Sequence, residues 1–241
     1  MSTSFGELPW GIDSCHLSLC RRPRLYWVDW ELQEGNGATF GRQSNGRGEV
    51  ILTAPVEDKK YLLPGWLKYS DEKFPTFTTA RPRGKPGYKP AGLNQCNPHE
   101  LDRWRQDAFR FPPYQYRDAF CLQNKAGQLR LPDMCEREVI KGLPRDYTLQ
   151  CFPKSHQGSQ AHLDERLCLI GNSWSVPVVT WLLGQVGAAL GLNEKLSLDD
   201  VVKRTAPGCT KMFKLISNVP LWSKFGILQL RGVKRFWSRN S

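Results

Sequence analysis

The sequence predicts an α+β fold from three observations. Short runs rich in aromatic and β-branched residues are typical of strands, and they occur in a chain that also carries several helix-capping patterns. The 241 residues include 17 prolines and 21 glycines, which favours a loop-rich chain over a helix bundle. Hydrophobic residues make up 40% and charged residues 24%, the balance of a globular protein that can bury a sizeable core.

The first half of the chain predicts strands separated by loops. Residues 25–30 form an aromatic run, and residues 49–54 are expected to be a second strand. The Gly- and Asn-rich stretch 34–47 is expected to be a loop. Residues 59–67 are expected to hold a helical turn. Residues 74–93, which are rich in proline, are expected to form a long loop of the kind that often carries function.

A helix and a hairpin are expected in the middle of the chain. The helix covers residues 97–109, because Asn97 can cap it and Glu100 can reach back to the cap. Residues 114–121 and 128–131 are expected to be strands joined by a turn.

Capping patterns also predict two short helices near the C-terminal end. Residues 133–141 are expected to be helical, with Gly142 as the stop signal. Ser197 can cap a last helix over residues 198–204.

The most apolar stretch, residues 176–192, is expected to be a buried helix. A helix over residues 164–170 precedes it, with a break at Gly171-Asn172-Ser173. The apolar stretch is short for a membrane span and includes Thr180 and Gln185, so we expect no membrane association through it.

Positive charge is concentrated in the tail. The net charge is +11, and residues 201–241 hold nine of the 34 basic residues and none of the 23 acidic ones. Basic segments favour polyanions such as nucleic acid or an anionic membrane surface, although a merely solvated tail has the same composition.

The cysteines predict neither a zinc site nor an oxidising compartment. None of the eight forms a Cys-x-x-Cys pair, and the four histidines do not lie at zinc-finger spacing from them, so no metal is expected. Residues 1–10 do not read as a signal peptide. Reduced thiols and a nuclear location are expected if the source is eukaryotic, and a cytoplasmic location otherwise.

Arg22-Pro23-Arg24 leads directly into the aromatic run. Side chains two residues apart on a strand point to the same side, so two guanidiniums would face one site and could bind a phosphate or a base carbonyl. A solvated basic strand end is the plainer reading. The pair resembles motif VIII of the DNA cytosine-5 methyltransferases. That resemblance implies that Arg24 contacts the target cytosine and that Arg22 positions the catalytic loop or the backbone.

A second segment, residues 130–147, resembles motif IX of the same family, which braces the target-recognition domain. Asp133 and Val139 depart from the family pattern, which usually has Thr and Arg there. An ordinary capped helix is the alternative. The matching residues are Arg130, Glu136, Gly142 and Pro144.

A third segment, residues 166–179, resembles motif X, and its Ser-Trp-Ser-Val-Pro-Val run is similar to the de novo methyltransferases of animals. The resemblance implies that this turn lies against the methyl donor, S-adenosylmethionine, with Asn172, Ser173 and Trp174 at the contacting positions. Backbone groups at the start of a helix suit such a role, because they point at polar ligands.

The order of the three segments implies a domain plan. Residues 1–47 hold the motif VIII strand region, residues 48–130 the target-recognition domain, residues 131–192 the return to the catalytic domain, and residues 193–241 a helix and the basic tail. The fold implied is a remnant of the Rossmann-like methyltransferase sheet, covered by the 176–191 helix. DNA contacts are expected from a basic loop: Thr78, Thr79, Arg81, Arg83, Lys85 and Lys89.

The parts of the family that carry the chemistry are not found. Methylation at C5 of cytosine needs a thiolate that adds at C6 of a flipped base, but no cysteine here follows a proline, and no Gly-rich donor loop is recognised. We therefore expect a DNA-binding fragment that is inactive alone and does not bind S-adenosylmethionine tightly. A second chain or an upstream segment would supply the missing motifs.

Two other readings stay open. The chain fits a non-catalytic DNA-binding or regulatory relative of such an enzyme. Its tail, in which aromatic residues alternate with basic ones, also suits an interfacial helix or single-stranded nucleic acid. The aromatic residues are Phe213, Trp222, Phe225, Phe236 and Trp237.

Overall fold

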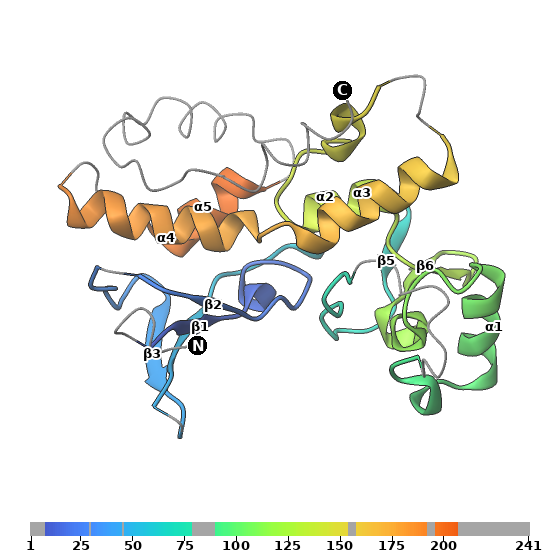
Figure 1. The fold of residues 1–241 in the computed structure, drawn as a ribbon, viewed down its shortest axis with the longest axis horizontal. Helices are drawn as coiled ribbons and strands as arrows, with labels where there is room; N and C mark the ends of the chain where they lie inside the picture. The colour runs from blue at the N-terminus through green and yellow to red at the C-terminus, as the bar shows by residue number, and fades with distance from the viewer. Residues whose placement is uncertain are drawn as a thin grey trace, which may run out of the picture. The chain divides into compact units, whose positions relative to one another are not determined.

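The computed structural model describes residues 8–28, 30–44, 46–78, 90–153, 158–191 and 196–206. The chain divides into two units, Met1–Gly208 and Cys209–Ser241, and every described residue belongs to the first. Within the described part, helices accompany one sheet of four strands and one of three, so the predicted α+β class is confirmed (Figure 1).

The four-stranded sheet has the order β2-β1-β4-β3. Neighbouring strands are antiparallel except β1 and β4, which run parallel. The expected 49–54 strand is present as β4, whereas the expected 25–30 strand ends early, at Tyr26. The bounds are β1 Trp10–Ile12, β2 Arg24–Tyr26, β3 Ala38–Arg42 and β4 Gly48–Leu52.

The expected loop over residues 34–47 is wrong, because β3 lies inside it. Gly35 and Ala38 exchange two backbone hydrogen bonds of 3.0 and 3.1 Å, and three successive residues, Gly35, Asn36 and Gly37, have positive φ. The glycines therefore mark a tight turn at the start of a hairpin. The boundary predicted at residue 47 falls between β3 and β4, two strands of one sheet.

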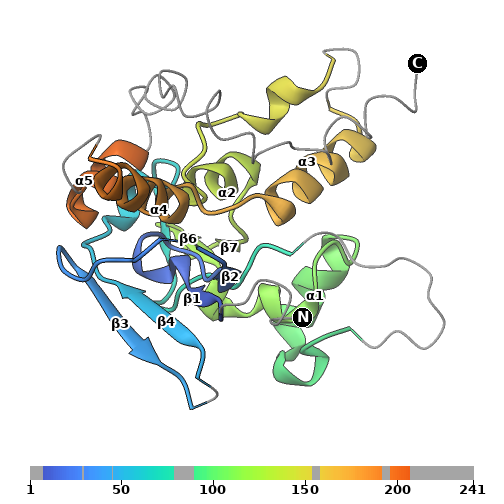
Figure 2. The ribbon, with the colours of Figure 1, turned by 60° about the vertical axis from the view of Figure 1, so that its left-hand side comes forward.

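Helices α4 (Val176–Ala189) and α5 (Leu198–Thr205) pack against the four-stranded sheet (Figures 1 and 2). Trp181 and Val178 of α4 are buried in one core with Ile12, Val50 and Leu52 of the strands. The expected helix over the strand region is thus present. The predicted capping of α5 is also confirmed, because Ser197 Oγ accepts the N–H of Asp200 at 3.1 Å.

Helix α3 (Gln160–Asn172) starts earlier than predicted, because Ser159 caps it by accepting the N–H of His162 at 3.1 Å. Together α3 and α4 have the length and composition of a membrane span, with 39% of the most apolar window buried. The backbone is extended at Ser173 and Ser175 between them, and α4 alone has 14 residues, fewer than the ~20 that a span needs. A core helix has the same composition.

The three-stranded sheet has the order β5-β6-β7 and is antiparallel throughout. Strands β6 and β7 form a hairpin that turns at residues 124–127, as expected, but its first strand lies after the expected residues 114–121. Residues 59–67 hold only the end of a 3-10 turn, Asp58–Lys60, and the start of β5. The strands are β5 Trp66–Lys68, β6 Leu122–Asn124 and β7 Leu129–Arg130.

The strand expected over residues 114–121 is wrong. Two 3-10 turns, Pro113–Tyr116 and Asp118–Phe120, occupy this segment. Pro112 and Pro113 fix the entry to the first turn, and the Tyr116 hydroxyl donates to Asp107 at 2.6 Å, which draws the segment back toward α1.

Helix α1 (Pro98–Gln106) has the predicted capping box but ends three residues early. Ala108 and Phe109 adopt positive φ there, and the Trp104 indole donates to the carbonyl of Phe111 at 2.8 Å. Helix α2 (Met134–Ile140) has the predicted extent within a residue. Three further 3-10 turns in the described part of the chain are Ser14–His16, Leu93–Gln95 and Thr148–Cys151.

Gly142 ends α2 at a point where α4 begins. Its φ is +82°, and a Cβ there would lie 2.8 Å from Cδ of Pro177 and 2.9 Å from Cβ of Val176. The same position thus needs both a left-handed backbone and an absent side chain.

We predict that Gly142→Ala destabilises the protein by about 2–4 kcal/mol, because it combines backbone strain with a clash against α4. Gly65→Ala is the matched control, since Gly65 has a φ of +85° with no atom within 4 Å of its Cβ position. It should cost about 1 kcal/mol. Equal losses in urea unfolding would contradict the close approach of α2 and α4.

Candidate functional site

The chain between α3 and α4, residues 171–176, is called here the α3–α4 junction. Ser173 closes α3, since its N–H donates to the carbonyl of Leu169 at 2.8 Å and its hydroxyl to that of Ile170 at the same distance. Asn172 is exposed, and Trp174 keeps 59% of its surface exposed. Three residues were predicted to contact the methyl donor. Asn172 and Trp174 present their side chains outward, whereas the Ser173 hydroxyl is hydrogen-bonded within α3.

Arg22 joins the motif VIII-like segment to this junction. Its Nη2 donates to the carbonyl of Gly171 at 2.7 Å, across 149 positions of sequence. Its own N–H donates to Asp13 Oδ1 at 2.6 Å. The residue is 2% exposed, and its Nε and Nη1 have no hydrogen-bond partner. Arg22 therefore lies beneath the junction, and two of its nitrogen atoms, Nε and Nη1, make no hydrogen bond there.

Arg24 differs from Arg22 in exposure. It is exposed and donates from Nη1 to the carbonyl of Pro23 at 2.9 Å. Burial, and secondly the charge of Arg24, lower the pKa of Arg22, so the two guanidiniums lie within electrostatic range. The strand β2 begins only at Arg24, so strand alternation, the basis for expecting both to face one site, does not extend to Arg22.

Arg130 and Glu136, predicted from their spacing, form a two-pronged ion pair. Nη1 lies 2.6 Å from Oε2 and Nη2 lies 3.0 Å from Oε1. Glu136 is fully buried, and its carboxylate also accepts the N–H groups of Leu63 and Asp133, both at 2.9 Å. The pair fixes α2 to β7 and to the segment before β5. Pro144 is exposed, and its carbonyl accepts the N–H of Tyr147 at 3.2 Å.

A second buried carboxylate, Glu138, was not singled out from the sequence. It is fully buried, and Oε1 accepts Arg166 Nη2 at 3.0 Å, the N–H of Thr148 at 2.9 Å and the Thr148 hydroxyl. Arg166 also donates from Nε to Thr148 Oγ1 at 2.9 Å. This cluster ties α2 to α3.

Two buried cations on the same stretch were also missed. Arg137 is 2% exposed, lies 4.1 Å from the Phe111 ring and 4.7 Å from the Phe77 ring, and donates from Nε to the carbonyl of Pro132 at 2.8 Å. Lys141 is 1% exposed, and its Nζ has no hydrogen-bond partner. The one available signal was the density of charge in Glu136-Arg137-Glu138-Val139-Ile140-Lys141, on a helix flanked by core segments.

The electrostatic surroundings of Lys141 disfavour its charge. Burial lowers its pKa from 10.5 to about 8, and the charges of Arg22 and Arg24 act in the same direction. Cys20 and Asp13 oppose the shift but do not outweigh it. Among the described residues no carboxylate forms an ion pair with this ammonium group, whose Nζ lies 5.8 Å from the centre of the Phe77 ring.

Most of the predicted DNA-contacting loop lies outside the described residues, namely Thr79, Arg81, Arg83, Lys85 and Lys89. The residues at the start of this loop are described, and they are held in place by the core. Phe77 is 3% exposed in the core, and Thr78 Oγ1 accepts the side-chain amide of Gln115 at 2.7 Å. The basic tail from residue 207 onward also lies outside the described residues.

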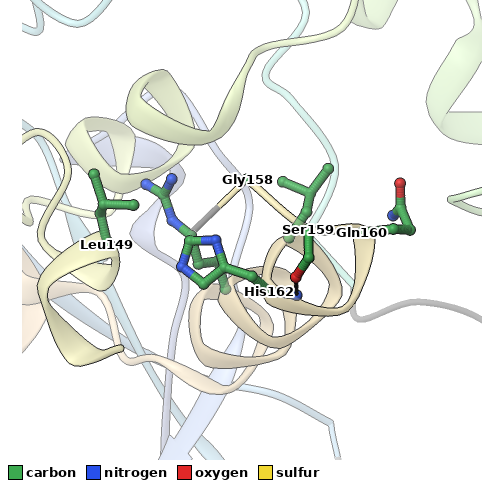
Figure 3. Close-up of a pocket in the computed structure, with 7 residues that line it drawn as sticks. Leu149, Gly158, Ser159, Gln160 and His162 are labelled. Atoms are coloured by element: carbon green, nitrogen blue, oxygen red, sulfur yellow. Dashed lines mark hydrogen bonds between the residues drawn. The ribbon is translucent and has the colours of Figure 1, made fainter. Parts of the chain in front are cut away.

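A cavity of about 220 Å³ lies at the far end of α3 from the junction (Figure 3). His162 lines it and is 4% exposed, with no hydrogen-bond partner on Nε2. The volume falls below the ~300 Å³ at which ligand sites usually begin, and no residue predicted from the sequence lines it. The lining residues are Leu149, Gly158, Ser159, Gln160, His162, Leu163 and Arg166. Among the described residues, no cluster of three metal-binding side chains occurs.

Comparison of the sequence with models of known protein families gives no match, and comparison with curated proteins likewise gives none.

We predict that Glu136→Ala destabilises the protein by about 3–5 kcal/mol, because Arg130 and two backbone N–H groups lose the carboxylate that accepts their hydrogen bonds. The control is Asp102→Ala, which breaks an exposed ion pair of 2.6 Å with Arg105 and should cost at most about 1 kcal/mol. Urea unfolding measures the free energy of unfolding of both variants and of the wild type. A Glu136 variant as stable as the control would show that the buried pair does not brace the fold.

The Lys141 pKa gives a pH prediction. Its folded value, about 8, lies below the unfolded 10.5, so the charged group destabilises the fold fully below pH 8 and progressively less as pH rises to 10.5. Lys141→Met should therefore be more stable than the wild type by roughly 3 kcal/mol at pH 7, and by less than half of that at about pH 9.5. The difference is measured by urea unfolding at both pH values. A pH-independent difference would contradict the shift.

Proposed function

We propose that the chain is the C-terminal, DNA-facing part of a DNA cytosine-5 methyltransferase, which binds DNA and does not transfer methyl groups by itself. One observation carries the proposal: the Arg22 guanidinium reaches the carbonyl of Gly171 at 2.7 Å. It brings together the segments that resemble motifs VIII and X. The motif IX-like helix reaches the same place, because the N–H of Val176 donates to the carbonyl of Lys141 at 2.9 Å.

Each part of the site has a role in this proposal. Arg24, exposed beside the buried Arg22, contacts the flipped cytosine, since a guanidinium can donate to a base carbonyl. The basic loop that follows the anchored Phe77 contacts the DNA backbone and groove. The sheet with its α4 cover represents the C-terminal remnant of the Rossmann-like methyltransferase sheet.

The junction would supply one side of a site for S-adenosylmethionine, which brings the methyl group in the complete enzyme. The exposed indole of Trp174 and the exposed amide of Asn172 suit the aromatic and polar parts of that molecule. The other side would come from a second chain or an upstream segment with a Gly-rich loop. Tight binding of the donor to this chain alone is therefore not expected.

Four of the described cysteines are poor nucleophiles. Cys20 is fully buried, and burial raises its pKa above the ordinary 9.0. Burial also raises the pKa of Cys15, Cys121 and Cys135 to about 11. Since the thiolate is the attacking form, these groups do not provide the adduct at C6 of cytosine. The nucleophile would be carried by the same partner as the donor loop.

A non-catalytic DNA-binding or regulatory relative is the second candidate, and the packing of α4 favours it. A helix left behind from a divided enzyme should be exposed, but Val178 and Trp181 are buried against the chain's own sheet, at 1% and 2% exposure. The opposite face of α4 favours the first candidate, a fragment of a larger enzyme. Leu183 and Leu190, two turns apart, remain 48% and 47% exposed, as expected where a larger assembly packs.

We predict that the purified chain binds a short DNA duplex with an affinity that falls steeply between about 50 and 200 mM salt. A duplex with a mismatched cytosine should bind more tightly than the paired one, because an unpaired base is cheaper to flip. Arg24→Ala should remove about tenfold of the affinity for the mismatched duplex, and Lys60→Ala, which lies on an exposed turn, should not. Fluorescence anisotropy measures all three.

The same preparation should transfer no methyl group from labelled S-adenosylmethionine to the duplex. Methyl transfer by the chain alone would contradict the proposal, as would DNA binding that ignores salt. Activity that appears on addition of a chain with the donor loop and the Pro-Cys pair would favour the fragment. Stimulation of an already active enzyme would favour the regulatory relative.

A further inference from the structure

The cavity at the N-terminal end of α3 has no part in the proposed function. Its lining comes from the Thr148–Cys151 turn and from the start of α3 (Figure 3). The cavity measures about 220 Å³. One buried water needs only ~15 Å³ of such space, so the cavity can hold several waters or one small molecule. The ~300 Å³ at which ligand sites usually begin applies to drug-sized molecules.

The lining of the cavity includes a buried imidazole. His162 is 4% exposed, and within the described part of the chain its Nε2 makes no hydrogen bond. The ring is packed edge-to-face against Phe152, with the ring centroids 4.9 Å apart. A buried polar atom without a partner is costly, so such an atom beside a cavity indicates a bound group that completes its hydrogen bonding.

Arg166 lines the same cavity. Its Nε donates to Thr148 Oγ1 at 2.9 Å, and its Nη2 donates to Glu138 Oε1 at 3.0 Å and to Asp146 Oδ1 at 3.4 Å. None of these three bonds uses Nη1, the remaining nitrogen of the guanidinium. Because the two carboxylates balance the charge of Arg166, this side of the cavity offers a hydrogen-bond donor and no surplus positive charge.

The first turn of α3 adds backbone donors. Ser159 and Gln160, at the start of the helix, both line the cavity. The first N–H groups of a helix have no acceptor within the helix. Ser159 Oγ accepts the N–H of His162 at 3.1 Å, which leaves those of Gln160 and Ala161 to be satisfied from outside the helix. They lie at the end where the helix dipole is positive, beside the buried imidazole.

We propose that this cavity binds a small molecule through a phosphate or carboxylate group. The oxyanion accepts hydrogen bonds from the imidazole of His162 and from the first N–H groups of α3, beside the guanidinium of Arg166. Imidazole can donate from Nε2 as a neutral tautomer or when protonated, and helix starts and guanidiniums are common partners of oxyanions. Leu149 and Leu163 offer apolar contact to the rest of the molecule. The proposal goes beyond DNA binding and does not depend on it, since no residue of the α3–α4 junction takes part.

The first test follows the imidazole signals of the full chain by NMR at constant pH, while sodium phosphate or sodium acetate replaces sodium chloride at equal ionic strength. The His162 signal, assigned with His162→Phe, should shift and reach a plateau in the millimolar range, as expected for an anion of few atoms. The signal of His99, which is exposed, should show no plateau. No plateau for His162 with either anion would show that the cavity is closed to such ligands and would overturn the proposal.

The second test compares melting points. The anion that shifts His162 should raise the melting point of the wild type by about 3–5 °C at ten times its dissociation constant. His162→Phe keeps a ring beside Phe152 but removes the donor, so it should lose this gain while still melting cooperatively in chloride. Leu149→Trp fills the cavity and leaves the imidazole in place, and it should lose the gain too. His99→Phe is the matched control and should keep it.

The outcomes also separate the ligand classes. A gain with phosphate alone assigns the site to a phosphate ester, and a gain with acetate alone assigns it to a carboxylic acid. Equal gains in the wild type and in both cavity variants would show that the anions act elsewhere and would overturn the proposal. A short DNA duplex that displaces the anion from His162 would make the cavity part of a DNA surface and overturn the assignment to a small molecule. Neither small anion requires DNA binding, so failure here is separable from failure of the proposed function.

Discussion

The structure depends on how helix α2 accommodates buried charge. Four charged side chains within six positions, from Glu136 to Lys141, are at most 2% exposed. Each buried charge needs a counterpart from another element, since its desolvation costs several kcal/mol. Arg130 of β7 meets Glu136, Arg166 of α3 meets Glu138, and two aromatic rings enclose Arg137. These interactions hold the three-stranded sheet and α3 against the short helix α2.

The C-terminal end of α2 then sets the position of α4. Gly142 allows α4 to approach within the space of a side chain, and the first N–H of α4 donates to the carbonyl of Lys141. Since α4 also covers the four-stranded sheet, α2 connects the two halves of the described fold. The α3–α4 junction lies where this connection is made. That is why segments as far apart in the sequence as Arg22, Lys141 and Gly171 meet at one place.

Local signals in the sequence predicted what local interactions build. The capping patterns at Asn97 and Ser197 gave the starts of two helices, because a side chain that accepts an N–H three residues on acts within its own turn. Strand β3 was missed because the glycines around it indicated a loop, and the 3-10 turns over residues 113–120 were missed because partners outside the segment decide them. Tyr116, for instance, is drawn to Asp107 and not to a neighbouring strand. The exact exposure of Arg22 and Arg24 likewise follows from tertiary packing. The partners of Glu138 and Lys141 cannot be read from spacing, since they lie on other elements or on no described element at all.

The most direct test of this account is the pKa of Lys141 itself, followed by NMR of the side-chain Cε in the full chain labelled at lysine, with Lys141→Met to assign the signal. The account predicts a titration midpoint of about 8 in the free protein. A midpoint at the ordinary value of 10.5 would mean that Lys141 is either solvated or already paired, and the claim that α2 holds an uncompensated charge would be wrong.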